Sequence, residues 1–103
     1  MAEVSWTASA LTDLDKITDY YAQEHPKYGQ TLADEIMKRT KQLILFPKSG
    51  RIVSELSESG VRELIYRNYR IVYWHDEEDD KVEIWTVFHF SRQFGGSEGS
   101  IEE

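Results

Sequence analysis

Hydrophobic residues recur at helical spacing in the first stretch of the chain, "ALTDLDKITDYYAQEHP". The apolar positions that share one predicted helical face are Ala10, Leu11, Leu14, Ile17 and Tyr21. Thr7 or Ser9 is expected to cap the start of this helix, because a side-chain oxygen there accepts from an otherwise unpaired backbone N–H. Pro26 disfavours helical geometry in the residue before it, so the helix is expected to end near Glu24.

A second helical pattern follows after "HPKYG" and runs from about Gln30 to Phe46, where Pro47 ends it. Its apolar positions form two adjacent rows of one face: Leu32, Ile36 and Leu43, then Ala33, Met37, Thr40 and Ile44. Two amphipathic helices joined by a few residues predict an αα-hairpin that buries its apolar stripe against another element.

The remaining patterns alternate with the period of two that is typical of β-strands. "AEVSW" predicts a short first strand through Val4 and Trp6, and residues 52–53 predict a short extended piece. Three strands follow at residues 61–67, 69–75 and 81–90, with a tight turn at Asn68 and the charged turn "DEEDD" at 76–80. In the last strand, strict alternation places one set of side chains on a common face: Val82, Ile84, Thr86, Phe88 and Phe90.

The order of elements is therefore β-α-α-β-β-β, which predicts the α+β class. The last three strands are joined by short turns and must be antiparallel. We expect a small antiparallel sheet with the N-terminal αα-hairpin packed on one face, which leaves the other face free for function. Residues 1–94 are expected to form a single domain, and residues 95–103, "GGSEGSIEE", a flexible acidic tail.

Composition and charge narrow the function classes. The 103 residues include 13% aromatic residues and no cysteine, so disulfides, thiolate metal sites and a cysteine nucleophile are excluded. No signal-peptide pattern and no membrane-spanning apolar stretch is found, and we expect a cytoplasmic protein. The formal net charge of −7 argues against general nucleic-acid binding. The charge is uneven, however, because residues 38–75 hold eight basic residues against three acidic ones.

The motifs for common chemistries are weak. "FGGSEG" follows the last strand and opens no helix, so it is not a phosphate-binding loop. His25, His75 and His89 lack the paired spacing of metal ligands, and we interpret His25 as a surface residue and His75 as a solvated strand end. "DEEDD" offers oxygen ligands for a hard cation, but it lacks the fixed spacing of an EF-hand loop and is interpreted as a solvated hairpin tip. We therefore expect no metal and no cofactor.

Arginines within the basic middle of the chain are the better indication of function. "VRELIYRNYRIVYW" at residues 61–74 holds three arginines and three tyrosines. Alternation places Arg62 with Leu64 and Tyr66 on one face of its strand, and Arg70 with Val72 and Trp74 on one face of the next. Two interpretations remain open at this point. The arginines are either strand charges paired with Glu63, Glu83 or the acidic tail, or a cationic, aromatic-flanked patch for phosphate or an acidic partner.

An ordered set of short motifs covers about residues 4–94. It comprises "WTASALTDL" at 6–14, "ITDY" at 17–20, "LILFPKSGR" at 43–51, "VREL" at 61–64, "YRIVY" at 69–73 and "VFHFSRQ" at 87–93. Together these resemble the RelE/ParE superfamily of type II toxins, and the ParE-like branch is favoured by "VRELIYRNYRIVY" and "HFSRQ". The resemblance implies a toxin that is neutralised by a cognate ParD/RelB-like antitoxin.

The two branches of that superfamily imply different targets. ParE-like members inhibit DNA gyrase without chemistry of their own, whereas RelE-like members are ribosome-dependent mRNA endonucleases that use cationic and aromatic side chains. Val61 and Glu63 stand where the nuclease branch is expected to have lysines, and no tyrosine follows Arg92. We therefore favour gyrase inhibition, with the ribosome and mRNA, or an inactive antitoxin-binding protein, as alternatives. The residues expected to contact the target are Arg62, Arg67, Arg70, His89 and Arg92, and the nuclease alternative would use Arg70, Arg92 and His89.

Overall fold

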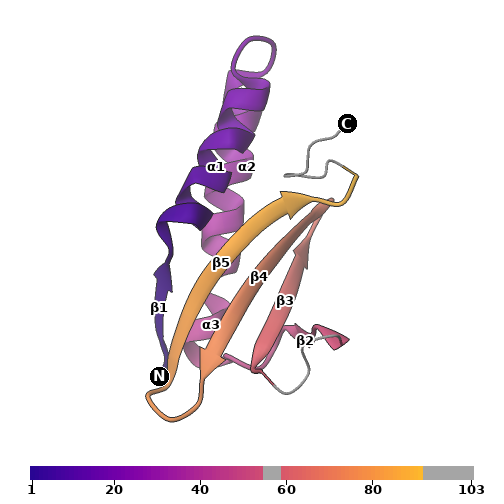
Figure 1. The fold of residues 1–103 in the computed structure, drawn as a ribbon. Helices are drawn as coiled ribbons and strands as arrows, with labels where there is room; N and C mark the ends of the chain where they lie inside the picture. The colour runs from indigo at the N-terminus through magenta and orange to yellow at the C-terminus, as the bar shows by residue number, and fades with distance from the viewer. Residues whose placement is uncertain (55–58, 92–103) are drawn as a thin grey trace.

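The structure is a computed structural model that describes residues 1–54 and 59–91. The elements follow in the order β1 (Glu3–Trp6), α1 (Ala8–Tyr21), α2 (Pro26–Arg39), α3 (Gln42–Leu45), β2 (Arg51–Ile52), β3 (Val61–Tyr66), β4 (Tyr69–Asp76) and β5 (Lys81–His89). Figure 1 shows the helical layer behind the sheet, with the α1–α2 hairpin projecting past the end of the strands. The α+β class and the order of the main elements are confirmed. The tail predicted at 95–103 lies outside the described residues.

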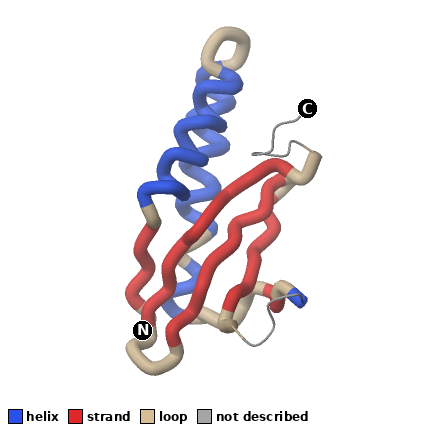
Figure 2. The backbone as a smooth tube through the Cα atoms, viewed as in Figure 1, coloured by secondary structure: helices blue, strands red, loops and turns tan. Residues whose placement is uncertain are grey.

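The sheet has five strands in the order β1-β5-β4-β3-β2. Strands β2 to β5 pair antiparallel, as expected from their short connections. Strand β1 pairs parallel with β5, with Val4 opposite Val82, so the expected antiparallel sheet is in fact mixed. The short piece expected at 52–53 is β2, which adds a fifth strand at the β3 edge. In Figure 2 the strands lie side by side with the helices on one side of them.

The first helix begins where expected, but the second helical segment consists of two helices, α2 and α3, instead of one. Thr7 caps α1, and its hydroxyl accepts from the N–H of Ala10 at 3.0 Å. Helix α2 begins at Pro26 rather than near Gln30, because proline is well suited to the first helical turn, where its missing N–H has no partner to lose. The chain leaves the helix at Thr40, whose hydroxyl donates to the carbonyl of Met37 at 2.7 Å, and α3 follows as a separate short helix. The single helix predicted to continue to Phe46 was therefore wrong in its second half.

One apolar core lies between the helices and the sheet. Its fully buried members include Ala10, Ile36, Leu43, Ile71 and Ile84. The apolar face predicted for α1 is buried in the core at Ala10, Leu14 and Ile17, which confirms the prediction there, whereas Leu11 is 45% exposed. Burying one methylene contributes about 0.8 kcal/mol, so this cluster is the main source of stability for the fold.

Strand β5 carries a β-bulge that the period-two pattern did not predict. Val72 pairs with Thr86 while Tyr73 pairs with Ile84, so Trp85 has no partner on β4. The bulge reverses the alternation, and Val87 is buried on the same side as Val82 and Ile84. The prediction that Thr86, Phe88 and Phe90 share the face of Ile84 was therefore wrong.

Asp13 of α1 closes the outer edge of β5 just beyond the bulge. Its carboxylate accepts from the hydroxyl of Thr86 at 2.6 Å and from the backbone N–H of Val87 at 3.1 Å. Strand β1 ends at Trp6, opposite Ile84, so this part of the β5 edge has no strand beside it. A carboxylate at such an edge satisfies a backbone donor that an incoming strand would otherwise use.

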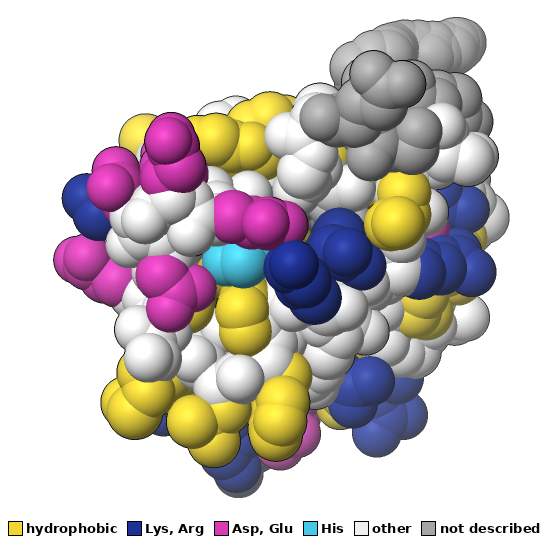
Figure 3. Space-filling model, turned by 90° about the horizontal axis from the view of Figure 1, so that it is seen from below, with side chains coloured by type: hydrophobic (Ala, Val, Ile, Leu, Met, Phe, Trp, Pro, Cys, Tyr) yellow, Lys and Arg dark blue, Asp and Glu magenta, His cyan; other side chains and the backbone are white. Residues whose placement is uncertain are grey.

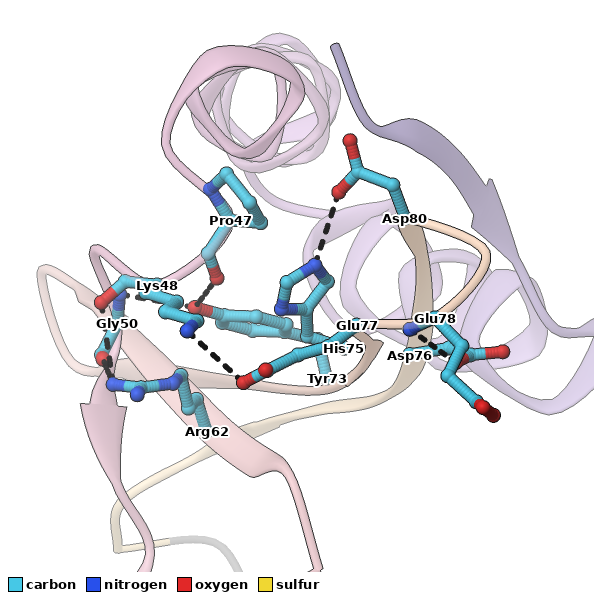
Figure 4. Close-up of polar contacts among 10 residues, drawn as sticks. All are labelled: Pro47, Lys48, Gly50, Arg62, Tyr73, His75, Asp76, Glu77, Glu78 and Asp80. Carbon is cyan, nitrogen blue, oxygen red and sulfur yellow. Dashed lines mark hydrogen bonds and ion pairs between the residues drawn. The ribbon is translucent and has the colours of Figure 1, made fainter.

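Tyr73 joins the sheet to the loop that precedes β2. Its side chain is fully buried, its hydroxyl donates to the carbonyl of Pro47 at 2.7 Å, and it accepts from the N–H of Gly50 at 2.9 Å (Figure 4). Burial raises the pKa of the Tyr73 phenol above its usual value, and the hydrogen bond from Gly50 opposes this only in part. Tyr73 therefore holds the 47–50 loop against the sheet only while its hydroxyl is protonated.

Stability is expected to fall at alkaline pH because of Tyr73. The folded-state pKa of this phenol lies above its unfolded value of about 10, so its stabilisation is fully present below that pH and is lost as the pH rises through the folded pKa. Urea midpoints measured from pH 8 to pH 11 should decrease more steeply for the native chain than for Tyr73→Phe. A difference of one bound proton between the folded and unfolded states changes the free energy of unfolding by at most about 1.4 kcal/mol per pH unit. Equal slopes in the two proteins would contradict this role for Tyr73.

Within residues 1–54 and 59–91, no helix is long and apolar enough to cross a membrane.

Candidate target-binding surface

The sheet face turned away from the helices, here called the open face, presents arginine and aromatic side chains. Strand register and burial place the helix-facing side chains on alternate positions, among them Leu64, Ile71 and Tyr73. The intervening positions form the open face: Arg51, Glu63, Ile65, Arg70, Val72, Trp74, Glu83, Trp85 and Phe88. Trp85 is exposed and the other apolar side chains of this face are half-buried, and a continuous apolar surface of this kind is typical of an interaction site.

Arg70 lies on the open face as the second residue of β4, close to the β3–β4 turn. Its guanidinium Nη1 lies 3.4 Å from Oε1 of Glu63, and its Cζ lies 5.1 Å from the centre of the Phe90 ring. The side chain is 40% exposed, so the charge is partly available to a partner. The prediction that Arg70 shares a face with Val72 and Trp74 is confirmed, and so is its pairing with Glu63.

Glu63 is the most deeply buried charged side chain of the open face. It is 8% exposed and accepts from Arg51 Nε at 2.7 Å through its other carboxylate oxygen. Glu63 therefore bridges arginines from β2 and β4 across β3. Arg51 is absent from the predicted site because only the pairing of β2 with β3, which places it opposite Glu63, brings it to this face.

Two stacked tryptophans extend the open face toward the lower end of the sheet. The ring centres of Trp74 and Trp85 are 6.4 Å apart, with 23° between the ring planes. The indole N–H of Trp74 donates to the Ser59 carbonyl at 2.9 Å, and that of Trp85 donates to Glu83 at 2.7 Å. Trp85 is 38% exposed and Phe90 41%, so large aromatic surfaces flank the arginines at both ends. Alternation along β5 already predicts that Trp85 shares the face of Glu83, which pairs with Trp74, and the stacked rings confirm this.

Arg62 lies on the opposite face from Arg70. It pairs with Tyr73 on the helix-facing side, and its Nη1 donates to the carbonyls of Gly50 at 2.8 Å and Lys48 at 3.2 Å (Figure 4). These bonds hold the 48–50 loop, so the contacts of Arg62 are structural.

Arg67 and His89 lie at the end of the sheet that carries the β3–β4 turn. Arg67 occupies the β3–β4 turn with a φ of 53°, is exposed, and donates to the hydroxyl of Tyr66 at 3.2 Å. His89 pairs with Tyr69 in the register, while Arg70 pairs with Phe88, so alternation places His89 and Arg70 on opposite faces. The His89 ring lies edge-on to Tyr69 and accepts from the N–H of Ser91 at 3.1 Å. Arg92 lies outside the described residues.

The lower end of the sheet carries the acidic turn. Figure 3, seen from below, shows acidic side chains gathered on one side of this end and lysine and arginine on the other. His75 is only 8% exposed and its Nε2 lies 3.1 Å from Asp80 Oδ1, so the interpretation of His75 as a solvated strand end was wrong. Asp76 accepts from the N–H of Glu78 at 3.1 Å, which organises the turn itself. The described part of the chain holds no cluster of three or more histidine or acidic residues suited to a metal.

Comparison with known proteins identifies relatives over nearly the whole of the described chain. Residues 4–94 match the family described as the ParE toxin of the type II toxin–antitoxin system parDE. Toxin RelE2 of Caulobacter vibrioides is 32% identical over 92 residues, which cover 89% of this chain and 99% of that protein.

Solved structures show the same fold. The chromosomal ParDE system from P. aeruginosa has a TM-score of 0.70 at 25% identity, covering 86% of this chain and 96% of that one. The intact E. coli RelBE toxin–antitoxin complex has a TM-score of 0.66 at 17% identity, covering 89% of this chain and 100% of that one, and this likeness concerns the fold alone.

Proposed function

Since the chain belongs to the ParE toxin family of type II toxin–antitoxin systems, we propose that it inhibits DNA gyrase by binding it through the open face. The family match and the 32% identity to Toxin RelE2 confirm the resemblance to the RelE/ParE superfamily. The chain is therefore a toxin of a type II system. The proposal concerns its target and its way of acting.

The composition of the open face is the observation that supports a protein target. Arginine, tryptophan and phenylalanine are the residues enriched in the centres of protein–protein interfaces. Here Arg70 lies beside the Phe90 ring and pairs with Phe88, and the Trp74–Trp85 stack lies further along the same face. A partner that covers this face would bury aromatic surface around one partly desolvated charge.

The arrangement gives less support to a ribonuclease. Cleavage of RNA requires cations placed on the phosphate together with a group that transfers a proton. In this chain Arg70 is already paired with Glu63, and His89 lies on the other side of β5. Glu63 also places a negative charge where a phosphate would approach Arg70. These positions favour binding over catalysis.

The ribonuclease remains the second candidate because a curated relative carries the name RelE2. In that case the target would be mRNA on the ribosome, with Arg70 and Arg92 on the phosphate. We also propose a cognate antitoxin of the ParD or RelB kind as a partner, because the solved relatives are toxin–antitoxin systems.

A pair of parallel assays tests the target. Folded protein free of antitoxin is added to a gyrase supercoiling reaction and to a translation extract that holds a reporter mRNA. We expect gyrase to lose supercoiling activity while the mRNA stays intact, because the open face suits a protein partner. Relaxation by topoisomerase I serves as the control for general effects on DNA. Cleaved mRNA with unaffected gyrase would contradict the proposal and favour the ribonuclease.

A further inference from the structure

We propose that Arg51 and Arg70, joined by Glu63, form a binding site for a carboxylate side chain of the target protein, and that Glu63 makes this site select carboxylate over nucleic-acid phosphate. The identity of the partner as a protein rests on the proposed function. The chemistry of the site rests on the three side chains, here called the Arg–Glu–Arg triad.

The geometry of the triad leaves donors available on both arginines. Arg51 Nε lies 2.7 Å from Glu63 Oε2, and Arg70 Nη1 lies 3.4 Å from Glu63 Oε1. A guanidinium has five N–H donors in a planar fork, and in each arginine one of them is directed at Glu63. The side chains remain 61% and 40% exposed respectively. Further donors of both groups can therefore meet an acceptor that approaches from solvent.

Burial of Glu63 makes the triad a preformed site. The carboxylate is 8% exposed and lies on the central part of β3, between the strands that carry the two arginines. The pairing of one buried carboxylate with two arginines limits the rotamers of both arginine side chains. The Phe90 ring beside Arg70 limits this side chain further. Less conformational entropy is lost when a ligand binds arginines that are already held in place.

The charge of the triad fits one carboxylate better than a nucleic-acid strand. Two arginines and one glutamate sum to a single positive charge, which one partner carboxylate neutralises. An RNA strand brings a negative charge with every nucleotide, and its affinity depends on several cations along its path. Glu83 adds a second carboxylate to the same face, and the aromatic side chains around the triad are apolar. A single acidic side chain set in an apolar protein surface matches this arrangement.

Glu63 is in this scheme a positioning residue that also sets specificity. Its negative charge lies within hydrogen-bonding distance of both arginines and repels any second anion that approaches them. A single partner carboxylate is repelled by Glu63 as one charge, whereas in a nucleic-acid strand each phosphate near Glu63 is repelled. Replacing Glu63 by glutamine keeps its size and leaves one acceptor oxygen for the two arginines, while it raises the triad to two positive charges.

Binding of two probes tests the proposal without using gyrase. The probes are a capped octapeptide of leucine and serine with one central glutamate and a single-stranded RNA of eight nucleotides, each titrated by calorimetry. We expect the native chain to bind the peptide at least about tenfold more tightly than the RNA. Glu63→Gln should raise RNA affinity at least about tenfold. Glu83→Gln, which removes the same charge from the same face without contacting either arginine, should change it less than about threefold.

Arg51→Met provides a second, independent variant, because the Arg51 side chain is 61% exposed. It should weaken peptide binding at least about fivefold, and the urea midpoint should fall because Glu63 loses its 2.7 Å partner. Tighter binding of RNA than of peptide by the native chain would overturn the proposal, and so would equal effects of Glu63→Gln and Glu83→Gln. If the protein prefers the peptide but leaves gyrase active, the carboxylate site is supported and gyrase is rejected as the target. If the protein inhibits gyrase but does not bind the peptide, gyrase is supported as the target and the carboxylate site is rejected.

Discussion

Replacing Arg70 by glutamine is expected to raise the concentration of protein needed to inhibit gyrase by at least about 30-fold. Arg70 is the only cation that combines the Glu63 pair with the aromatic ring of Phe90 among the described residues. Losing an arginine at the centre of a desolvated interface costs about 2 kcal/mol or more, and this free energy corresponds to that factor in affinity. Half-inhibitory concentrations in the supercoiling reaction measure the effect. Glutamine keeps a hydrogen-bond donor for Glu63, so the fold should be retained.

Arg39→Gln is the matched control for this experiment. Arg39 is an exposed arginine in the last turn of α2, in the layer on the far side of the sheet from the open face. Its loss removes the same charge from the chain and is expected to change inhibition by less than about twofold. Similar effects of the two substitutions would show that inhibition depends on net charge, and the assignment of the open face to the target would then be rejected.

Replacing Gly50 by alanine is expected to destabilise the protein by about 3 kcal/mol. A Cβ at this position would lie 2.6 Å from the Tyr73 hydroxyl and 2.7 Å from the backbone carbonyl oxygen of Glu63. Neither neighbour can move easily, because Tyr73 is fully buried and Glu63 lies on β3, which is paired with a strand on each side. Overpacking costs about 1–3 kcal/mol, and breaking the hydrogen bond between Gly50 and Tyr73 adds a comparable amount. Urea denaturation followed by tryptophan fluorescence measures the change.

Gly29→Ala is the comparison for Gly50→Ala. A Cβ at Gly29 would meet the Cβ of Tyr21 at 3.0 Å, which is tight, but alanine in a helix is favoured over glycine by about 1 kcal/mol. These effects oppose each other, so we expect a change of less than about 1 kcal/mol. An equal loss in the two variants would mean that the contact between the 47–50 loop and Tyr73 contributes little to stability.

Local patterns were sufficient to predict most of the fold. The spacing of Leu14, Ile17 and Ile36 predicted the buried helix faces, because a helix repeats every 3.6 residues whatever it packs against. Short turns at Asn68 and at 76–80 required antiparallel neighbours. The bulge at Trp85, the parallel pairing of β1 and the end of α2 at Thr40 were missed. The bulge and the parallel pairing depend on contacts with residues far away in the sequence, as with Asp13 and Val87, which are 74 positions apart.

For the candidate target-binding surface, too, the sequence predicted some features and only the structure showed others. The sequence alone determined that Arg70 shares a face with Val72 and Trp74, since alternation along one strand is a local property. It also determined the family, because the ordered motifs span residues 4–94. Only the tertiary structure decided that Arg62 turns to the helix side of the sheet and Arg51 to the open face. The pairing of β2 with β3 brings Arg51 to Glu63 across a loop of the chain, and residues so far apart in sequence leave no periodic signal of their contact.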